Sequence, residues 1–120
     1  MEYSFESIIN NLRKSKFRSS FHLSDSDIKT INEKGISKIR EHAFSLLKNR
    51  IKIKSENDGR QTPWKGHPVF VAQHALALCC RKCMEKWYNL SPDRVLSDNE
   101  IDYFSDLATE WIKKEFNNKL

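Results

Sequence analysis

The fold is decided by residues 66–87, which read GHPVFVAQHALALCCRKCMEKW. Pro68 suits the first position of a helix, because the N–H that proline lacks would have no partner there. The next interruption is Ser91-Pro92, which ends the helical pattern. The stretch therefore predicts one uninterrupted central helix over residues 68–87.

On such a helix the three cysteines and His74 point in opposite directions. Each residue turns by about 100°, which gathers Cys79, Cys80 and Cys83 on one face and places His74 on the other. Apolar side chains at Val69, Ala72, Leu76 and Trp87 fall on the cysteine face. We therefore expect the cysteine face to pack against the core.

Helical patterns also occupy most of the remaining chain. They cover residues 4–13 weakly, residues 24–35 and 36–50, and a segment that begins at Ser97. No strand-like alternation persists. The sequence predicts an all-α fold, a single compact domain of four to five helices around a central His/Cys-bearing helix. Residues 1–15 are expected to be an N-terminal arm or weak helix, and residues 16–118 the helical domain.

Two helix starts carry capping chemistry. Ser24 is followed by acidic residues at 25 and 27, and Ser97 is followed by Glu100 at capping-box spacing. Gly35 is a plausible helix stop. Residues 51–66 form a long polar connection that contains Asn-Asp-Gly and Thr-Pro turn signals. Loops of this length are often functional.

Composition excludes several protein classes. The chain of 120 residues is 38% hydrophobic and 31% charged, as in a globular protein. Its longest apolar run, residues 75–80, is far too short to cross a bilayer. Three cysteines within five residues make a poor disulfide framework, which favours a reducing, cytoplasmic compartment.

The net charge of +5 favours acidic partners, including nucleic acid. Basic side chains form two short runs, one over residues 13–18 and one over residues 48–54. Each run is also compatible with an ordinary solvated face.

The cysteines predict a possible metal site. Cys79 and Cys83, and likewise Cys80 and Cys83, have the spacing of helical chelating pairs. Three thiolates and one imidazole would complete a tetrahedral Zn²⁺ site, with His22 or His42 as the fourth ligand. Two other interpretations remain open: the thiols pack the core as small hydrophobic groups, or they serve as redox thiols.

The opposite face predicts an anion site or an acid–base site. His74, Arg81 and Glu85 form a row on the helix, and His67 extends it. The polar loop brings Asn57, Asp58, Arg60 and Gln61 toward this row. Arg60, Gln61, His67, His74 and Arg81 are the candidate anion-binding residues. For catalysis, His67 or His74 would act as the base beside Arg81, with Asp58 orienting it. The alternative is a purely structural hydrogen-bond network.

The same stretches resemble a small bacterial family of domains of unknown function. They are FR at 17–18, FHLS at 21–24, NDGRQTP at 57–63, GHPVF at 66–70 with QHA at 73–75, and CCRKC at 79–83 with KW at 86–87. In that family a His often follows the Trp, where this chain has Tyr88. The resemblance covers residues 16–113 and implies no particular activity.

Three functions follow as hypotheses. The first is a small metal- or anion-binding module that contacts nucleic acid. The second is an enzyme that acts on an anionic, phosphate-containing substrate through a His/Arg site. The third is a structural or protein-interaction domain.

Overall fold

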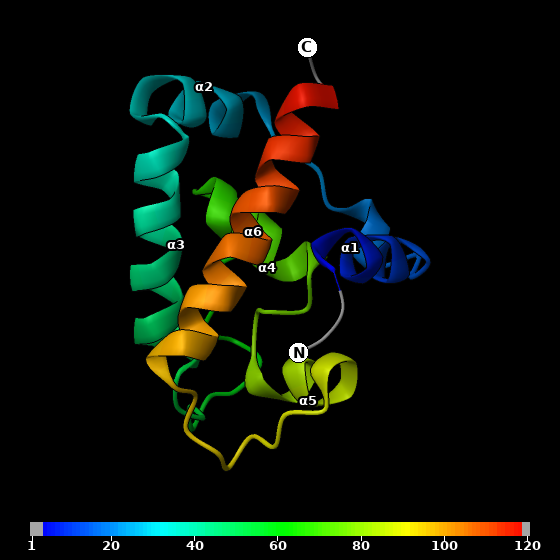
Figure 1. Cartoon of the computed structure of the whole chain (residues 1–120), viewed down its shortest axis with the longest axis vertical. Helices are drawn as coiled ribbons and strands as arrows, with labels where there is room; N and C mark the ends of the chain where they lie inside the picture. Colours follow the sequence, from blue (N-terminus) through cyan, green and yellow to red (C-terminus); the bar gives the residue numbers. More distant parts are fainter. Residues whose placement is uncertain (1–3, 119–120) are drawn as a thin grey trace.

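The computed structural model describes residues 4–118, and all regular structure in that range is helical (Figure 1). The elements are α1 (Phe5–Arg13), η1 (Arg18–Ser20, a 3-10 turn), α2 (Asp25–Lys34), α3 (Ile36–Ile51), α4 (Pro68–Ala75), α5 (Arg81–Tyr88) and α6 (Asp98–Asn118). The all-α prediction is confirmed. The predicted count of four to five helices is wrong, because residues 4–118 form six α-helices.

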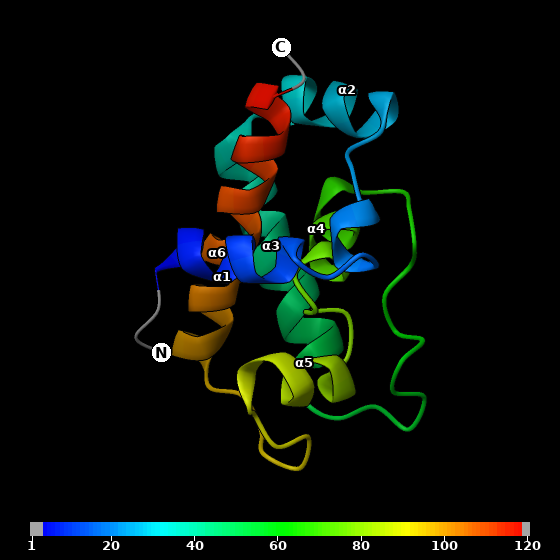
Figure 2. The ribbon, with the colours of Figure 1, turned by 90° about the vertical axis from the view of Figure 1, so that its right-hand side faces the viewer.

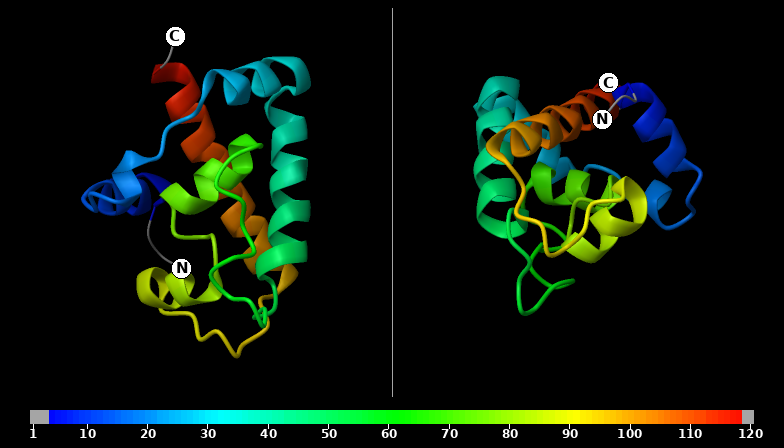
Figure 3. Two further views of the ribbon diagram at one scale, coloured as in Figure 1. Left: turned by 180° about the vertical axis from the view of Figure 1, so that it is seen from behind. Right: turned by 60° about the horizontal axis from the view of Figure 1, so that its bottom comes forward.

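The core lies between the two longest helices and α4. Helices α3 and α6 run antiparallel, and α4 packs behind them (Figures 1 and 3). Buried side chains follow each helix at helical spacing, as at Ile39, Ala43 and Leu47 of α3. Each large apolar side chain buried in this way stabilises the fold by roughly 1.5–3 kcal/mol.

The predicted caps form as hydrogen bonds. The Ser24 hydroxyl accepts from the N–H of Asp27, and the Asp27 carboxylate accepts from the N–H of Ser24. Ser97 and Glu100 make the same reciprocal pair before α6. These caps satisfy backbone donors that a helix start leaves without partners, so short local sequence patterns fix both helix starts.

The prediction of an uninterrupted central helix is wrong. Helix α4 ends at Ala75, and α5 begins only at Arg81. The chain leaves α4 through Ala77, whose φ of 58° lies in the left-handed region. The N–H of Leu78 donates to the carbonyl of Gln73 (2.7 Å) and the N–H of Ala77 to that of His74 (3.5 Å), which is a Schellman-type ending.

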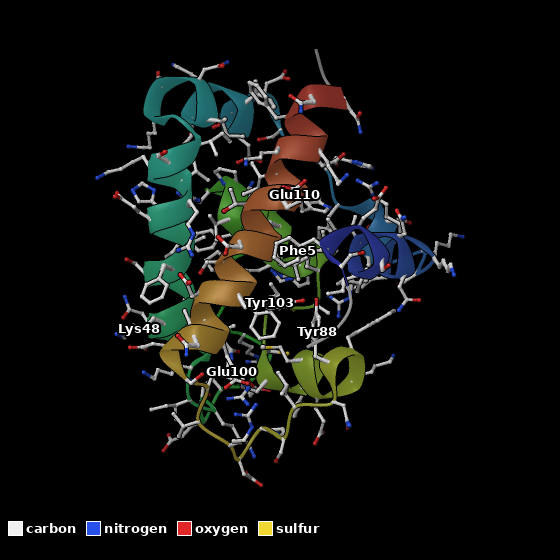
Figure 4. All side chains as sticks on the ribbon, viewed as in Figure 1. Phe5, Lys48, Tyr88, Glu100, Tyr103 and Glu110 are labelled. Atoms are coloured by element: carbon white, nitrogen blue, oxygen red, sulfur yellow. The ribbon has the colours of Figure 1, made fainter. Side chains whose placement is uncertain are left out.

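Two side-chain hydrogen bonds stabilise the break between α4 and α5. The buried Gln73 side chain donates through Nε2 to the carbonyl of Leu78 (3.0 Å). The Tyr88 hydroxyl, extending from α5 toward α6, donates to the carbonyl of Leu76 (2.5 Å; Figure 4). Both carbonyls would serve helix hydrogen bonds in an unbroken rod. The break changes the direction of the chain between α4 and α5, and the cysteines lie at this change of direction.

The N-terminal helix joins the core. Ile9 and Leu12 are buried, and Phe5 packs edge-on against Tyr103 of α6 at 5.2 Å between ring centroids (Figure 4). Residues 1–3 of the predicted N-terminal arm lie outside the described residues. Figure 2 shows α1 crossing α6 and η1 lying beside α4. In the described range, every helix is too short or too polar to span a membrane.

Candidate metal centre

Three thiols meet at the corner between α4 and α5. Cys79 and Cys80 lie in the connection, and Cys83 lies in the first turn of α5. Their Sγ atoms all lie within 4.8 Å of one another. Cys79 and Cys80 are buried, whereas Cys83 is partly exposed. The cluster is therefore close enough to share one ion and open on one side.

The start of α5 is built around this cluster. Cys80 is the N-cap residue, and its Sγ accepts a hydrogen bond from the N–H of Cys83 (3.4 Å). The carboxylate of Asp58 accepts from the N–H groups of Arg81 and Lys82, both at 3.0 Å. The first three amides of α5 are thus satisfied by one sulfur and one carboxylate. This C-x2-C segment at a loop-to-helix junction resembles the loop spacing of structural zinc sites more closely than a continuous helix would.

The long connection between α3 and α4 supplies Asp58. Gln61 holds the carboxylate by donating through Nε2 (2.8 Å), and its own Oε1 accepts from the N–H of Gly59 (2.8 Å). Burial alone would raise the pKa of Asp58, but the hydrogen bonds from Gln61, Arg81 and Lys82 outweigh it and lower the pKa. Asp58 therefore remains ionised at the positive end of the α5 dipole.

Arg18 of η1 reaches the cluster from the opposite side. Its Nη2 lies 3.2 Å from the Sγ of Cys83, and its Nη1 lies 3.7 Å from that of Cys79. Nη1 also donates to the carbonyl of His74 (2.7 Å). The side chain is only 8% exposed, and no carboxylate pairs with it among residues 4–118. Since a buried cation needs compensating charge, the sulfurs are its natural counterions.

The thiols differ in acidity. The hydrogen bond from the Cys79 thiol lowers the pKa of Cys83 to about 5, with further contributions from Cys80 and Arg18. The Cys79 thiol donates to Cys83, and this hydrogen bond together with burial raises the pKa of Cys79. Burial likewise raises the pKa of Cys80. Cys83 is therefore the most acidic of the three thiols, and it lies beside the guanidinium of Arg18.

The predicted fourth ligands have other partners. The Nδ1 of His22 bonds to Oε1 of Glu115 (2.9 Å) near the end of α6. The Nδ1 of His42 faces the Nε2 of His67 at 3.0 Å. Within the part of the chain that the structure describes, the group of donor atoms close enough to share a metal consists of the three cysteines. The structure does not bring His22 or His42 to the sulfurs.

The ring of His74 is buried outside the sulfur cluster, although not on the far face of one continuous helix as predicted. Its Nε2 lies 3.3 Å from the carbonyl oxygen of Thr62 and 3.1 Å from that of Pro63. Trp64 stacks on the ring at 4.1 Å between centroids. Burial lowers the pKa of His74, so the neutral ring donates to these carbonyls. His74 thus holds the long connection against α4.

His67 acts at the start of α4. Its Nδ1 accepts from the N–H of Val69 (3.0 Å), which makes its own side chain the helix cap. That leaves the proton on Nε2, which donates to His42. Burial, with the nearby His42 ring, lowers the pKa of His67 to about 4.

The predicted row of His74, Arg81 and Glu85 does not form, because α5 does not continue α4. Arg81 is fully buried, and its guanidinium donates to the carbonyls of Ile51 (3.5 Å), Lys52 (3.2 Å) and Ser91 (2.8 Å). It ties three chain segments together. The predicted anion-binding and catalytic residues therefore do not form one site. His67 contacts His42, and His74 contacts the carbonyls of the long connection. Asp58 and Gln61 lie at the start of α5, and Arg81 is buried beneath it. Arg60 is exposed.

A cavity of about 260 Å³ lies between α1, η1, α4 and α6, on the side of Arg18. Arg13, Arg18, Leu76, Trp111 and Glu115 are among its lining residues. The residues predicted for acid–base chemistry do not line it. This arrangement gives no support to the predicted acid–base site.

The sequence patterns did not place Arg18 beside the thiols, where the structure puts it. It lies 61 positions before Cys79 in the chain. Within the sequence it counts as one member of a basic run, and local spacing gives no sign that it is buried. The sequence patterns likewise did not point to Trp64, which stacks on the His74 ring.

The chain matches one family model over most of its length. A family model described as a domain of unknown function (DUF4186) matches residues 6–113. The chain belongs to this family. The matched range includes Arg18, Asp58 and all three cysteines. No solved structure matches the chain.

Proposed function

We propose that this DUF4186 protein is a small metal-binding module in which Cys79, Cys80 and Cys83 bind one thiophilic divalent ion, zinc in the first instance. The proposal depends on the three Sγ atoms lying within 4.8 Å of one another. Zn–S bonds of about 2.3 Å in tetrahedral geometry place ligand sulfurs about 3.8 Å apart. Small side-chain rotations are therefore enough to reach ligand geometry.

The charge balance supports an ion with three thiolate ligands. Three thiolates and one divalent cation sum to −1, and the guanidinium of Arg18 supplies the matching positive charge. Its N–H groups at 3.2 and 3.7 Å from two sulfurs are placed as outer-shell donors to the ligands. The fourth position of a tetrahedral ion would be left to water or a small ligand, because three protein ligands leave it open.

Metal analysis of untagged full-length protein, followed by Zn²⁺ and Co²⁺ titration, tests this proposal. We expect one equivalent of metal, thiolate-to-cobalt charge-transfer absorption, and release of protons on binding. Cys83→Ser should weaken binding by more than about tenfold, since it removes a direct ligand. His22→Gln and His42→Gln are the matched controls and should bind as the parent does.

Two results would overturn the metal site. One is less than about a tenth of an equivalent of bound metal after loading. The other is equal affinity in Cys83→Ser and the parent, with circular dichroism showing both folded. Weakening by His22→Gln or His42→Gln would instead assign the fourth ligand that the sequence predicted.

The second part of the proposal is contact with nucleic acid, favoured by the net charge of +5. In the second basic run, Lys48 and Lys52 lie 3.6 and 2.9 Å from Asp98, and Lys54 lies 4.0 Å from Asp93. Two carboxylates thus offset part of the positive charge of that run, whereas the first run has no ion pair within residues 4–118. The first run, with Arg13, Lys14 and Lys16 exposed, is therefore the better candidate for an acidic partner.

A further inference from the structure

Three aromatic rings form a surface beside the first basic run, and we call Phe17, Phe21 and Trp64 the aromatic surface. Phe17 is 52% exposed and Trp64 is 63% exposed, which is unusual for rings of this size. Phe21 joins them: its ring centroid lies 5.2 Å from that of Phe17 and 6.1 Å from that of Trp64. Two segments more than 40 residues apart thus present one apolar surface to solvent.

The indole of Trp64 is held in place from below. It stacks on His74 at 4.1 Å with an interplanar angle of 11°, and it lies within 8° of parallel to Phe21. His74 is itself buried and bonded to the carbonyls of Thr62 and Pro63. An exposed ring with a fixed support is preorganised, so it loses little side-chain entropy when a second ring stacks on it.

The charged residues that flank these rings in the chain are all basic. Residues 13–21 and 59–67 contain six basic residues and no Asp or Glu. Arg18 is buried against the thiols. The others are exposed and form no ion pair within residues 4–118; they are Arg13, Lys14, Lys16, Arg60 and Lys65. Exposed lysines directly adjoin both exposed rings in the chain, at Lys16–Phe17 and Trp64–Lys65.

We infer that the aromatic surface binds single-stranded nucleic acid, with bases stacking on Trp64 and Phe17 and phosphates contacting the flanking lysines. This inference rests on the nucleic-acid part of the proposed function and is independent of the metal site. Stacking rings beside free cations are the combination by which proteins bind single strands with little sequence preference. A duplex keeps its base faces stacked internally, so it would engage only the lysines.

Fluorescence anisotropy with end-labelled oligonucleotides tests the surface in the full-length protein. The probes are a thymidine DNA strand, a uridine RNA strand and a DNA duplex of equal length, each titrated from about 50 to 200 mM salt. We expect both single strands to bind more tightly than the duplex. The DNA and RNA arms then show whether the 2′-hydroxyl contributes.

Variants separate stacking from charge. Trp64→Ala should weaken single-strand binding by about 5- to 100-fold with little change in salt dependence, because it removes a stacking base. Trp64→Phe keeps a ring and should recover part of the loss. Lys65→Gln should instead reduce the salt slope by about 0.7, the value for one phosphate contact on a single strand. Ile53→Ala is the matched control, since Ile53 is equally exposed (63%) but lies on another part of the connection.

The outcomes are distinguishable. Binding that is unchanged in Trp64→Ala, with the duplex bound as tightly as the single strands, would overturn the aromatic surface while leaving nucleic-acid contact elsewhere. No binding of any probe at 50 mM salt would overturn both the surface and the nucleic-acid part of the proposed function, whatever the metal analysis gives. Trp64-dependent binding of an acidic peptide, without binding of a single strand, would assign the surface to a protein partner and overturn the inference.

Discussion

The Nη2 atom of Arg18 lies 3.2 Å from the Sγ of Cys83, although the two residues are 65 positions apart in the chain. This contact joins η1 to the first turn of α5. It also brings a buried guanidinium to a thiol on the exposed side of the cluster. The hydrogen bond from Cys79 and the contact with Arg18 both lower the pKa of Cys83.

Replacing Arg18 by Gln should raise the pKa of Cys83 from about 5 in the metal-free protein. The rise should stop short of the usual value of 9.0, because the hydrogen bond from Cys79 is the larger cause and remains. The pH dependence of alkylation by iodoacetamide, localised to Cys83 by mass spectrometry, measures this change. Arg13→Gln removes a nearby exposed cation and should leave the profile unchanged.

Asp58→Asn should destabilise the fold by about 1 kcal/mol near neutral pH, because one α5 amide loses its acceptor and the helix dipole loses its anion. The folded-state pKa of Asp58 lies below its usual 3.8. Its contribution is therefore present above pH 3.8 and is lost as pH falls through the folded-state value.

Urea unfolding of the parent and Asp58→Asn at neutral and acidic pH gives the comparison. The gap between the two should close as the solution is acidified. Asp93→Asn is the matched control, since that carboxylate is 89% exposed and lies as far as 4.0 Å from its partner Lys54, so it contributes little to stability. An equal loss of stability in both variants would contradict a capping role for Asp58.

His67 should make the fold acid-sensitive. Its folded-state pKa of about 4 lies below the usual 6.5, so the unfolded chain binds the proton more readily. Stability from this residue is complete above pH 6.5 and is lost as pH falls from 6.5 toward 4. At pH 5 the loss should be about 1 kcal/mol, because solvent screens the charge of this partly exposed ring.

The substitution His67→Asn keeps a side-chain cap for α4 and removes the titrating ring. Its unfolding free energy should change less between pH 7.5 and pH 5 than that of the parent. A steep pH dependence that persists in His67→Asn would assign the effect to other groups.

Arg81→Met should destabilise the fold by about 3 kcal/mol or more, because the carbonyls of Ile51, Lys52 and Ser91 lose a shared buried donor. Thermal or urea unfolding measures the loss. The neighbouring exposed residue offers the control: Lys82→Met should change stability by less than about 0.5 kcal/mol. A near-neutral Arg81→Met would mean that buried apolar packing replaces the three hydrogen bonds at no cost.

Local sequence was sufficient wherever the relevant partners are near neighbours in the chain. The capping pairs Ser24–Asp27 and Ser97–Glu100 are three residues apart, and both form as predicted. The helix start at Pro68 also follows from one residue. The break after Ala75 could not be predicted in this way, because Ala-Leu-Ala-Leu is a strong helix-forming sequence and the groups that oppose it are Gln73 and Tyr88.

The candidate site was also predicted only in part from the sequence. Its three thiols were identified from their spacing, but the reason given for their proximity, one face of a continuous helix, was wrong. They meet because the helix ends and a corner forms. The histidines chosen as further ligands face Glu115 and His67, which lie 93 and 25 residues away in the chain.

By itself the sequence determined the helical class, most helix boundaries and which three thiols form the candidate metal centre, because helix periodicity and capping act over three or four residues. Only the tertiary structure decided where the central helix breaks, that Asp58 caps α5, and that Arg18 is buried against the thiols. Those three features depend on hydrogen bonds between groups from 12 to 65 positions apart in the chain. Such pairs form only after the helices have packed, so no local pattern specifies them.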